Sequence, residues 1–133
     1  MSSHKTEHYK LHTWAAGDDF LREEFNDNFE ALDASVRMVT GAYAGDGEAQ
    51  RVIHLGLTPL AVLLVTQDGV IRSGSNTSYT YGGLALPQRP ARTPDNKPAV
   101  EIVENGFRVG SRLQGNYIWT NWGADTYHYI AFY

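Results

Sequence analysis

Aromatic side chains crowd the C-terminal part of the sequence, where they stand beside amide and carboxylate groups. Trp119, Asn121, Trp122 and Asp125 share one short segment. An aromatic ring offers a flat apolar face on which a sugar can stack, while amides and carboxylates bind its hydroxyl groups. The turn at residues 120–125 lies between two predicted strands, so we expect an exposed Trp122 side chain at its tip. These residues predict a glycan-binding platform centred on Trp122.

A second pair of aromatic residues could extend this platform or replace it. Tyr79 and Tyr81 follow the loop 73–78, which is rich in Ser, Asn and Thr. Core packing is the competing interpretation for all of these rings, because a strand such as 126–132 must bury one of its two alternating faces. Both interpretations are open from the sequence.

Catalysis is not indicated by the acidic residues. A glycosidase needs two carboxyl groups about 5 to 9.5 Å apart in a groove. The sequence also lacks the glycine-rich phosphate loop, the His-Glu-x-x-His motif and the Gly-x-Ser-x-Gly motif of common enzymes. We therefore predict no catalytic residue and a protein that is not an enzyme. The carboxylates considered lie in or beside predicted turns or on strand faces: Asp46, Glu101, Glu104 and Asp125.

Histidines near the N-terminus have a spacing that could bind a metal ion on a helix. His4, His8 and His12 are four residues apart, which would align three imidazoles on one helical face. The segment has no helical pattern, however, and a polar arm is the better interpretation. The sequence has no cysteine, so thiolate chemistry and disulfides are excluded. We predict no metal site and no cofactor.

Length, charge and hydrophobicity narrow the class of protein further. The 133 residues suffice for one domain with its own core. A net charge of −4 with scattered basic residues argues against nucleic acid as a partner, because no basic patch attracts its phosphates. The polar N-terminus predicts no signal peptide, and the aliphatic run 60–65 is too short to cross a bilayer. We expect synthesis in the cytoplasm and no membrane insertion.

The chain divides into three segments by pattern. Residues 1–17 form a polar N-terminal arm, residues 18–39 an amphipathic helix and residues 40–133 a β domain. From residue 40 onward, short β-type runs alternate with Gly, Asn, Asp and Pro, which predicts a mainly β fold: a compact antiparallel β-sandwich or a barrel-like domain. Asn105-Gly106 predicts a type I′ hairpin, because both residues tolerate positive φ. The run 60–65 is apolar on both faces and is expected inside a sheet.

The predicted helix carries one apolar stripe. Asp18 and Asp19 suit its first turn, where carboxylates face the positive end of the helix dipole. The stripe follows the a/d spacing of a coiled coil, which two heptads alone do not prove. The helix either lies on its own β domain or forms a short parallel coiled coil between subunits. The stripe, at spacings of four, three, four and three, is Phe25, Phe29, Leu32, Val36 and Val39.

Several segments together resemble a known group of proteins. The sequence Phe25-Asn26-Asp27-Asn28-Phe29-Glu30-Ala31-Leu32-Asp33 resembles an element near the start of many small tail-fibre and baseplate-associated proteins of phages and prophages of Gram-positive bacteria. The β domain is similar to those of such fibres in the segments 41–47, 51–62, 105–109 and 127–132.

The resemblance implies a virion component that forms a homotrimer. Its N-terminal arm and helix would join other proteins of the phage tail or of a similar particle, and its β domain would contact a bacterial surface glycan. It also implies location in the virion or a phage-tail-like particle. A purely structural particle component without a ligand and a surface-glycan hydrolase are the alternative functions.

Overall fold

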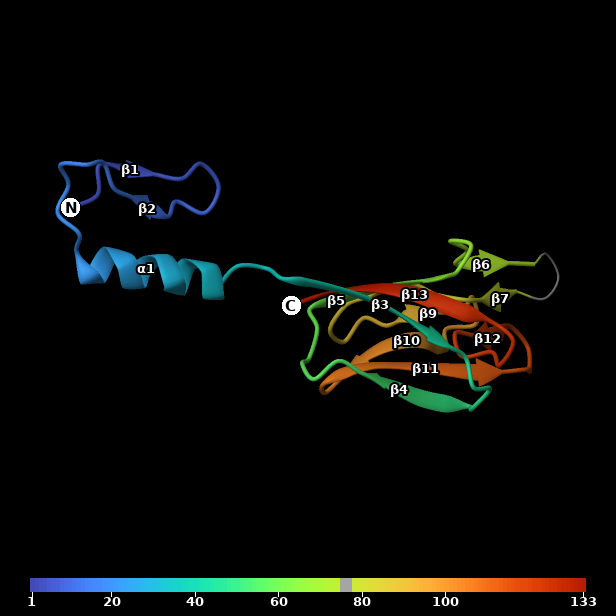
Figure 1. Ribbon diagram of the computed structural model, residues 1–133. Helices are drawn as coiled ribbons and strands as arrows, with labels where there is room; N and C mark the ends of the chain where they lie inside the picture. Colours follow the sequence, from blue (N-terminus) through green and yellow to red (C-terminus); the bar gives the residue numbers. More distant parts are fainter. Residues whose placement is uncertain (75–77) are drawn as a thin grey trace. The chain divides into compact units, whose positions relative to one another are not determined.

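The computed structural model describes residues 1–74 and 78–133, which form two compact units, Met1–Val36 and Arg37–Tyr133 (Figure 1). Residues 75–77, in the predicted loop 73–78, lie outside the described residues. The predicted arm (1–17) and most of the predicted helix (18–39) therefore belong to one unit, while the β domain begins a few residues before the predicted residue 40. Each unit is described below by itself.

The N-terminal unit consists of a small hairpin and a helix. Strands β1 (His4–Lys5) and β2 (His12–Thr13) pair antiparallel, and helix α1 spans Arg22–Asp33. The helix begins later than predicted because Asp18 does not cap it. Instead, the Asp18 carboxylate accepts hydrogen bonds from the backbone amides of Ser3 (2.9 Å) and Ala15 (2.7 Å). The first acidic turn of the helix is supplied by Glu23 and Glu24.

The helix also ends earlier than predicted. The Ser35 hydroxyl donates to the carbonyl of Leu32 just beyond the last turn. Val36 therefore lies outside the helix, and Val39 lies in strand β3. The predicted five-residue stripe is thus wrong at its C-terminal end, where β-sheet pairing replaces the helix. Its helical part is Phe25, Phe29 and Leu32.

Two sheets make up the second unit (Figure 1). One has the order β3-β13-β5-β8, with β3 Met38–Ala44, β13 Thr126–Phe132, β5 Ala61–Thr66 and β8 Gly83–Ala85. The other has the order β6-β7-β12-β11-β10-β9, with β4 also paired to β11; their bounds are β6 Arg72–Ser73, β7 Tyr79–Thr80, β12 Tyr117–Trp119, β11 Gly106–Arg112, β10 Pro98–Val103, β9 Ala91–Arg92 and β4 Gln50–His54.

The core lies between the two sheets, as in the predicted mainly β sandwich. The sheets are not purely antiparallel as predicted, because β7 and β12 pair in parallel. Strand β13 alternates in the expected way: Tyr127 and Ala131 are fully buried, whereas His128 between them is exposed. As predicted, β5 lies inside its sheet, between β13 and β8. The buried side chains of the core come from both sheets: Tyr43, Val62, Leu64, Ala85, Val100, Phe107, Val109, Tyr127 and Ala131.

The β10–β11 hairpin is present, but its turn differs from the prediction. Val103 pairs with Gly106, so the turn residues are Glu104 and Asn105. Asn105 has a positive φ of 63°, whereas Gly106 belongs to the strand and has no positive φ. Gly106 is instead required for close packing, because a Cβ there would overlap the backbone carbonyl of Ile53 in β4. The type I′ assignment is therefore wrong.

This contact predicts that Gly106→Ala destabilises the β unit. Strand β4 would have to move away from β11, which we expect to cost about 1–3 kcal/mol in the free energy of unfolding. Gly123→Ala is the control, because an added Cβ there would meet its neighbours only at ordinary contact distances, from 3.8 Å. Chemical denaturation should show a lower midpoint for Gly106→Ala alone. Equal midpoints for the two variants would contradict the steric role of Gly106.

Candidate functional site

Aromatic residues and carboxylates meet in a surface hollow of about 440 Å³ in the β unit. Four residues predicted for ligand binding line it: Tyr81, Trp119, Trp122 and Asp125. The other lining residues were not predicted: Thr66, Asp68, Val70 and Ser73. A concave site with aromatic walls and a few polar groups is the usual form of a small-ligand site. We call this site the aromatic hollow.

Sheet pairing brings these residues together from distant parts of the sequence. In the second sheet, Ser73 of β6 pairs with Tyr79 of β7, and Tyr79 pairs with Tyr117 of β12. Trp119 ends β12, and the turn that follows carries Trp122 and Asp125. The turn after β5 contributes Thr66, Asp68 and Val70. The one sequence signal for that last group was the Asp68-Gly69 turn, which says nothing about its neighbours in space.

Trp119 is the centre of the aromatic cluster. Its ring centroid lies 4.7 Å from that of Trp122, 4.7 Å from that of Tyr79 and 5.8 Å from that of Tyr81. Tyr79 is not among the residues that line the hollow, but it packs edge-on against Tyr117 at 4.9 Å. Each ring is thus held by at least one other, which fixes the faces that line the hollow. Both interpretations of these rings, packing and a surface binding site, therefore apply: the aromatic residues pack together and also border the hollow.

Polar groups around the aromatic hollow offer hydrogen bonds. The Ser73 hydroxyl donates to the hydroxyl of Tyr81 at 3.1 Å. The indole N–H of Trp119 is buried and has no acceptor among the described residues. A buried donor without a partner favours an acceptor supplied by water or by a ligand.

Asn121 does not belong to this site, contrary to the prediction. Its side chain is 0% exposed, and both its Nδ2 and its Oδ1 atom form hydrogen bonds with the turn between β3 and β4. The Nδ2 group donates to the Asp46 carboxylate (2.6 Å) and to the carbonyl of Glu48 (3.1 Å), while Oδ1 accepts from the amide of Asp46 (3.2 Å). Hydrogen bonds from the Glu48 amide and then from Asn121 lower the pKa of Asp46. Asn121 therefore fastens one turn to another and cannot contact a ligand.

We accordingly predict a structural effect of Asn121→Ala. The change removes the hydrogen-bond partner of the Asp46 amide and of the Glu48 carbonyl, and one of the donors to the Asp46 carboxylate. It should lower the free energy of unfolding by about 1–3 kcal/mol. Thermal melting followed by circular dichroism would measure the loss. A variant with unchanged melting would show that this buried amide is not needed to hold the turn.

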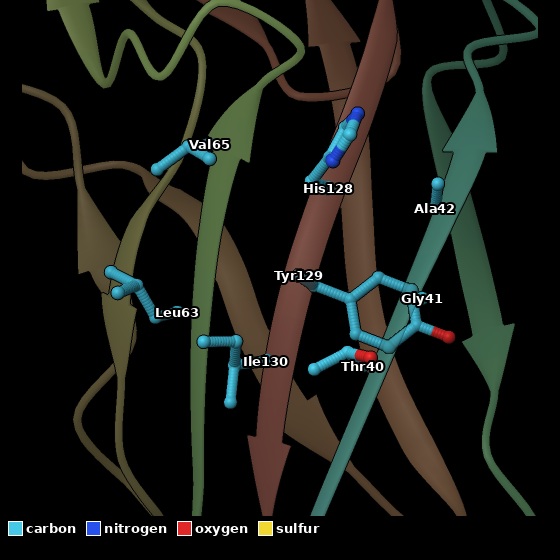
Figure 2. Close-up of a pocket in the computed structure, with 8 residues that line it drawn as sticks. All are labelled: Thr40, Gly41, Ala42, Leu63, Val65, His128, Tyr129 and Ile130. Carbon is cyan, nitrogen blue, oxygen red and sulfur yellow. The ribbon is translucent and has the colours of Figure 1, made fainter.

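A second hollow, of about 520 Å³, lies on the outer face of the first sheet (Figure 2). Cross-strand register places Thr40, Ile130 and Leu63 in one row and Ala42, His128 and Val65 in the next. This face is mostly apolar. The sequence signal for it was the run 60–65, which is apolar on both faces, although the prediction did not say which side would be uncovered.

The N-terminal histidines whose spacing was considered for a metal ion do not form a metal site among the described residues. Among residues 1–74 and 78–133, no group of three or more His, Cys, Asp or Glu side chains is placed to hold a metal ion. His4 and His12 lie on the two strands of the N-terminal hairpin, with His8 in the turn between them. The described part of the chain contains no helix that is long and apolar enough to span a membrane.

The fold and the aromatic hollow define a class of protein: a small β-sandwich domain with an aromatic surface site, preceded by a separate helical unit. No protein-family model, curated protein or solved structure matches the chain.

Proposed function

We propose that the chain is a non-catalytic fibre or receptor-binding module of a phage tail or similar particle, and that it recognises a bacterial surface glycan. The observation that carries this proposal is the aromatic hollow. Three aromatic residues, Tyr81, Trp119 and Trp122, line it together with the carboxylates of Asp68 and Asp125. Sugar binding needs this combination of flat apolar faces and polar groups that bind hydroxyls.

The assignment to a phage tail or similar particle is based on the resemblance of the sequence to tail-fibre proteins. We propose that the N-terminal arm and helix attach the chain to other particle proteins, and that the β unit faces the host. The chain would then function in the virion or in a phage-tail-like particle.

The N-terminal unit supports a homotrimer in this proposal. Helix α1 packs its polar face on its own hairpin: the Glu24 carboxylate accepts hydrogen bonds from the Ser2 amide (2.8 Å) and the Trp14 indole (3.1 Å). The helical part of the apolar stripe stays exposed, at 39% for Phe25, 57% for Phe29 and 42% for Leu32. Three copies could bury these side chains against one another, as in a short coiled coil.

Each alternative function has one observation in its favour. The apolar outer face of the first sheet favours a purely structural component, because large uncovered apolar patches mark protein contacts. Asp68 and Asp125 favour a hydrolase, because both carboxylates line the same hollow. The aromatic walls favour our proposal over the structural component, which does not need them.

A glycan array probed with the purified full chain tests the proposal. We expect retention on one class of bacterial wall polysaccharide and no increase in reducing sugar when that polysaccharide is incubated with the protein. Retention on no bacterial glycan would favour the structural component, and release of reducing sugar would favour the hydrolase.

A further inference from the structure

We infer that the aromatic hollow takes a positively charged ligand: the ammonium group of an amino sugar whose amine is not acetylated. This inference rests on the proposed function and narrows it to one chemical class of glycan. A neutral hexose could stack on the rings alone, and an anionic sugar would meet like charge.

The charge of the aromatic hollow is negative. Asp68 and Asp125 both line it, and none of its eight described lining residues is basic. Among the described residues, neither carboxylate forms an ion pair with a cationic side chain. Two carboxylates that line one hollow without a counter-ion attract a cation more strongly than either would alone.

Two arginines close to the hollow, Arg72 in sequence and Arg51 through its contact with Asn121, are occupied elsewhere. Arg72 is adjacent to Ser73 on β6, but its guanidinium donates to the carbonyl of Arg92 at 2.9 Å. Arg51 donates to the carbonyl of Ala44 at 2.7 Å and lies 3.5 Å from the carboxylate of Asp46. These contacts draw both guanidinium groups to partners outside the hollow, which leaves its carboxylates for a ligand.

The aromatic walls suit the same ligand. A cation over an aromatic face is attracted by the ring quadrupole, most strongly by Trp. The hollow has two Trp residues with ring centroids 4.7 Å apart and a Tyr ring 5.8 Å from Trp119. An amino sugar can therefore stack its ring on one aromatic face and place its ammonium group between the rings and the carboxylates.

Paired oligosaccharides that differ only in acetylation test the inference. Short β-1,4-linked oligomers of glucosamine and of N-acetylglucosamine would be titrated calorimetrically into the full chain, in a slightly acidic buffer that keeps the amines protonated. We expect the glucosamine oligomer to bind at least about tenfold more tightly, because only it supplies the cation. The double variant Asp68→Asn, Asp125→Asn should lose this preference.

Asp→Asn keeps the side-chain shape, and the Asp125 turn is held by its backbone, whose carbonyl accepts from Gly45 and whose amide donates to Trp122. Glu104→Gln is the control, because it removes one charge from the far end of β11 and should leave the preference unchanged. Circular dichroism would verify that all variants fold.

The outcomes separate this inference from the proposed function. Equal affinity for the two oligomers would overturn the ammonium preference and leave glycan recognition standing. Binding of neither oligomer would also overturn it, since glucosamine presents the ammonium directly, while retention on the glycan array would still decide the proposed function. A preference that persists in the double variant would overturn the role of Asp68 and Asp125.

Discussion

Replacing Phe29 with Asp is expected to convert a trimer into a monomer. In sedimentation equilibrium at micromolar concentration, the unaltered protein should have three times the chain mass of 14.8 kDa, and the variant should have the mass of a single chain. Phe29 is 57% exposed in the middle of the apolar stripe, so three copies of an Asp would meet where three rings would otherwise be buried. Burying an unpaired carboxylate costs several kcal/mol, which exceeds what so short a helix can offset.

The variant should leave the N-terminal unit itself intact. The hydrogen bonds between helix and hairpin come from another face, through Glu24 and through Asn28, whose amide exchanges two hydrogen bonds with the backbone of His12. Burial raises the pKa of Glu24, but hydrogen bonds from Ser2 and Trp14 outweigh it and lower the pKa. These contacts should therefore stabilise the unit above the unfolded pKa of Glu24 and fail as pH falls through the folded value.

Glu30→Gln is the matched control for the trimer prediction. It changes the helix charge by one unit at an exposed position away from the stripe and should keep the trimer mass. A monomer for the unaltered chain would defeat the coiled coil and leave the exposed stripe for another partner. A trimer that survives Phe29→Asp would place the subunit contact elsewhere.

Replacing Trp122 with Ala should abolish most attachment to host cells or their wall polysaccharide while the protein stays folded. We expect affinity to fall by roughly thirtyfold, which is the effect of removing one dominant aromatic anchor, about 2 kcal/mol. Its backbone holds the neighbouring turns: the Trp122 amide donates to the Tyr127 hydroxyl at 3.1 Å, and the Trp122 carbonyl packs against Gly45. The backbone contacts survive the substitution.

Two controls accompany this variant in a binding assay on immobilised wall polysaccharide. Trp122→Phe keeps a flat ring and should retain part of the affinity. Tyr9→Ala removes an aromatic side chain that is 55% exposed in the N-terminal unit and should have no effect. Unfolding of Trp122→Ala would assign the ring to the core, whereas a folded variant with unchanged attachment would remove the aromatic hollow from the proposed function.

The sequence by itself predicted the features that depend on neighbouring residues. Alternation in 126–132, the turn signal at Asn105-Gly106 and the apolar run 60–65 suffice for a β-rich domain, because strand and turn preferences act over a few residues. The aromatic residues of the C-terminal segment could also be identified from the sequence, because they are close together in the chain. Periodicity also located helix α1, although it extended the helix into residues that pair in a sheet.

Tertiary structure decided which of these side chains share a site. Only the packing of the two sheets places Asp68, after β5 in one sheet, and Trp119, at the end of β12 in the other, at the same hollow. Only the contact between two turns buries Asn121 against Asp46. Local pattern cannot distinguish an Asn that faces a ligand from one that holds a distant turn, since both suit the same backbone. Burial is set by whatever packs opposite a residue, and for Asn121 that partner lies 75 positions away in the chain.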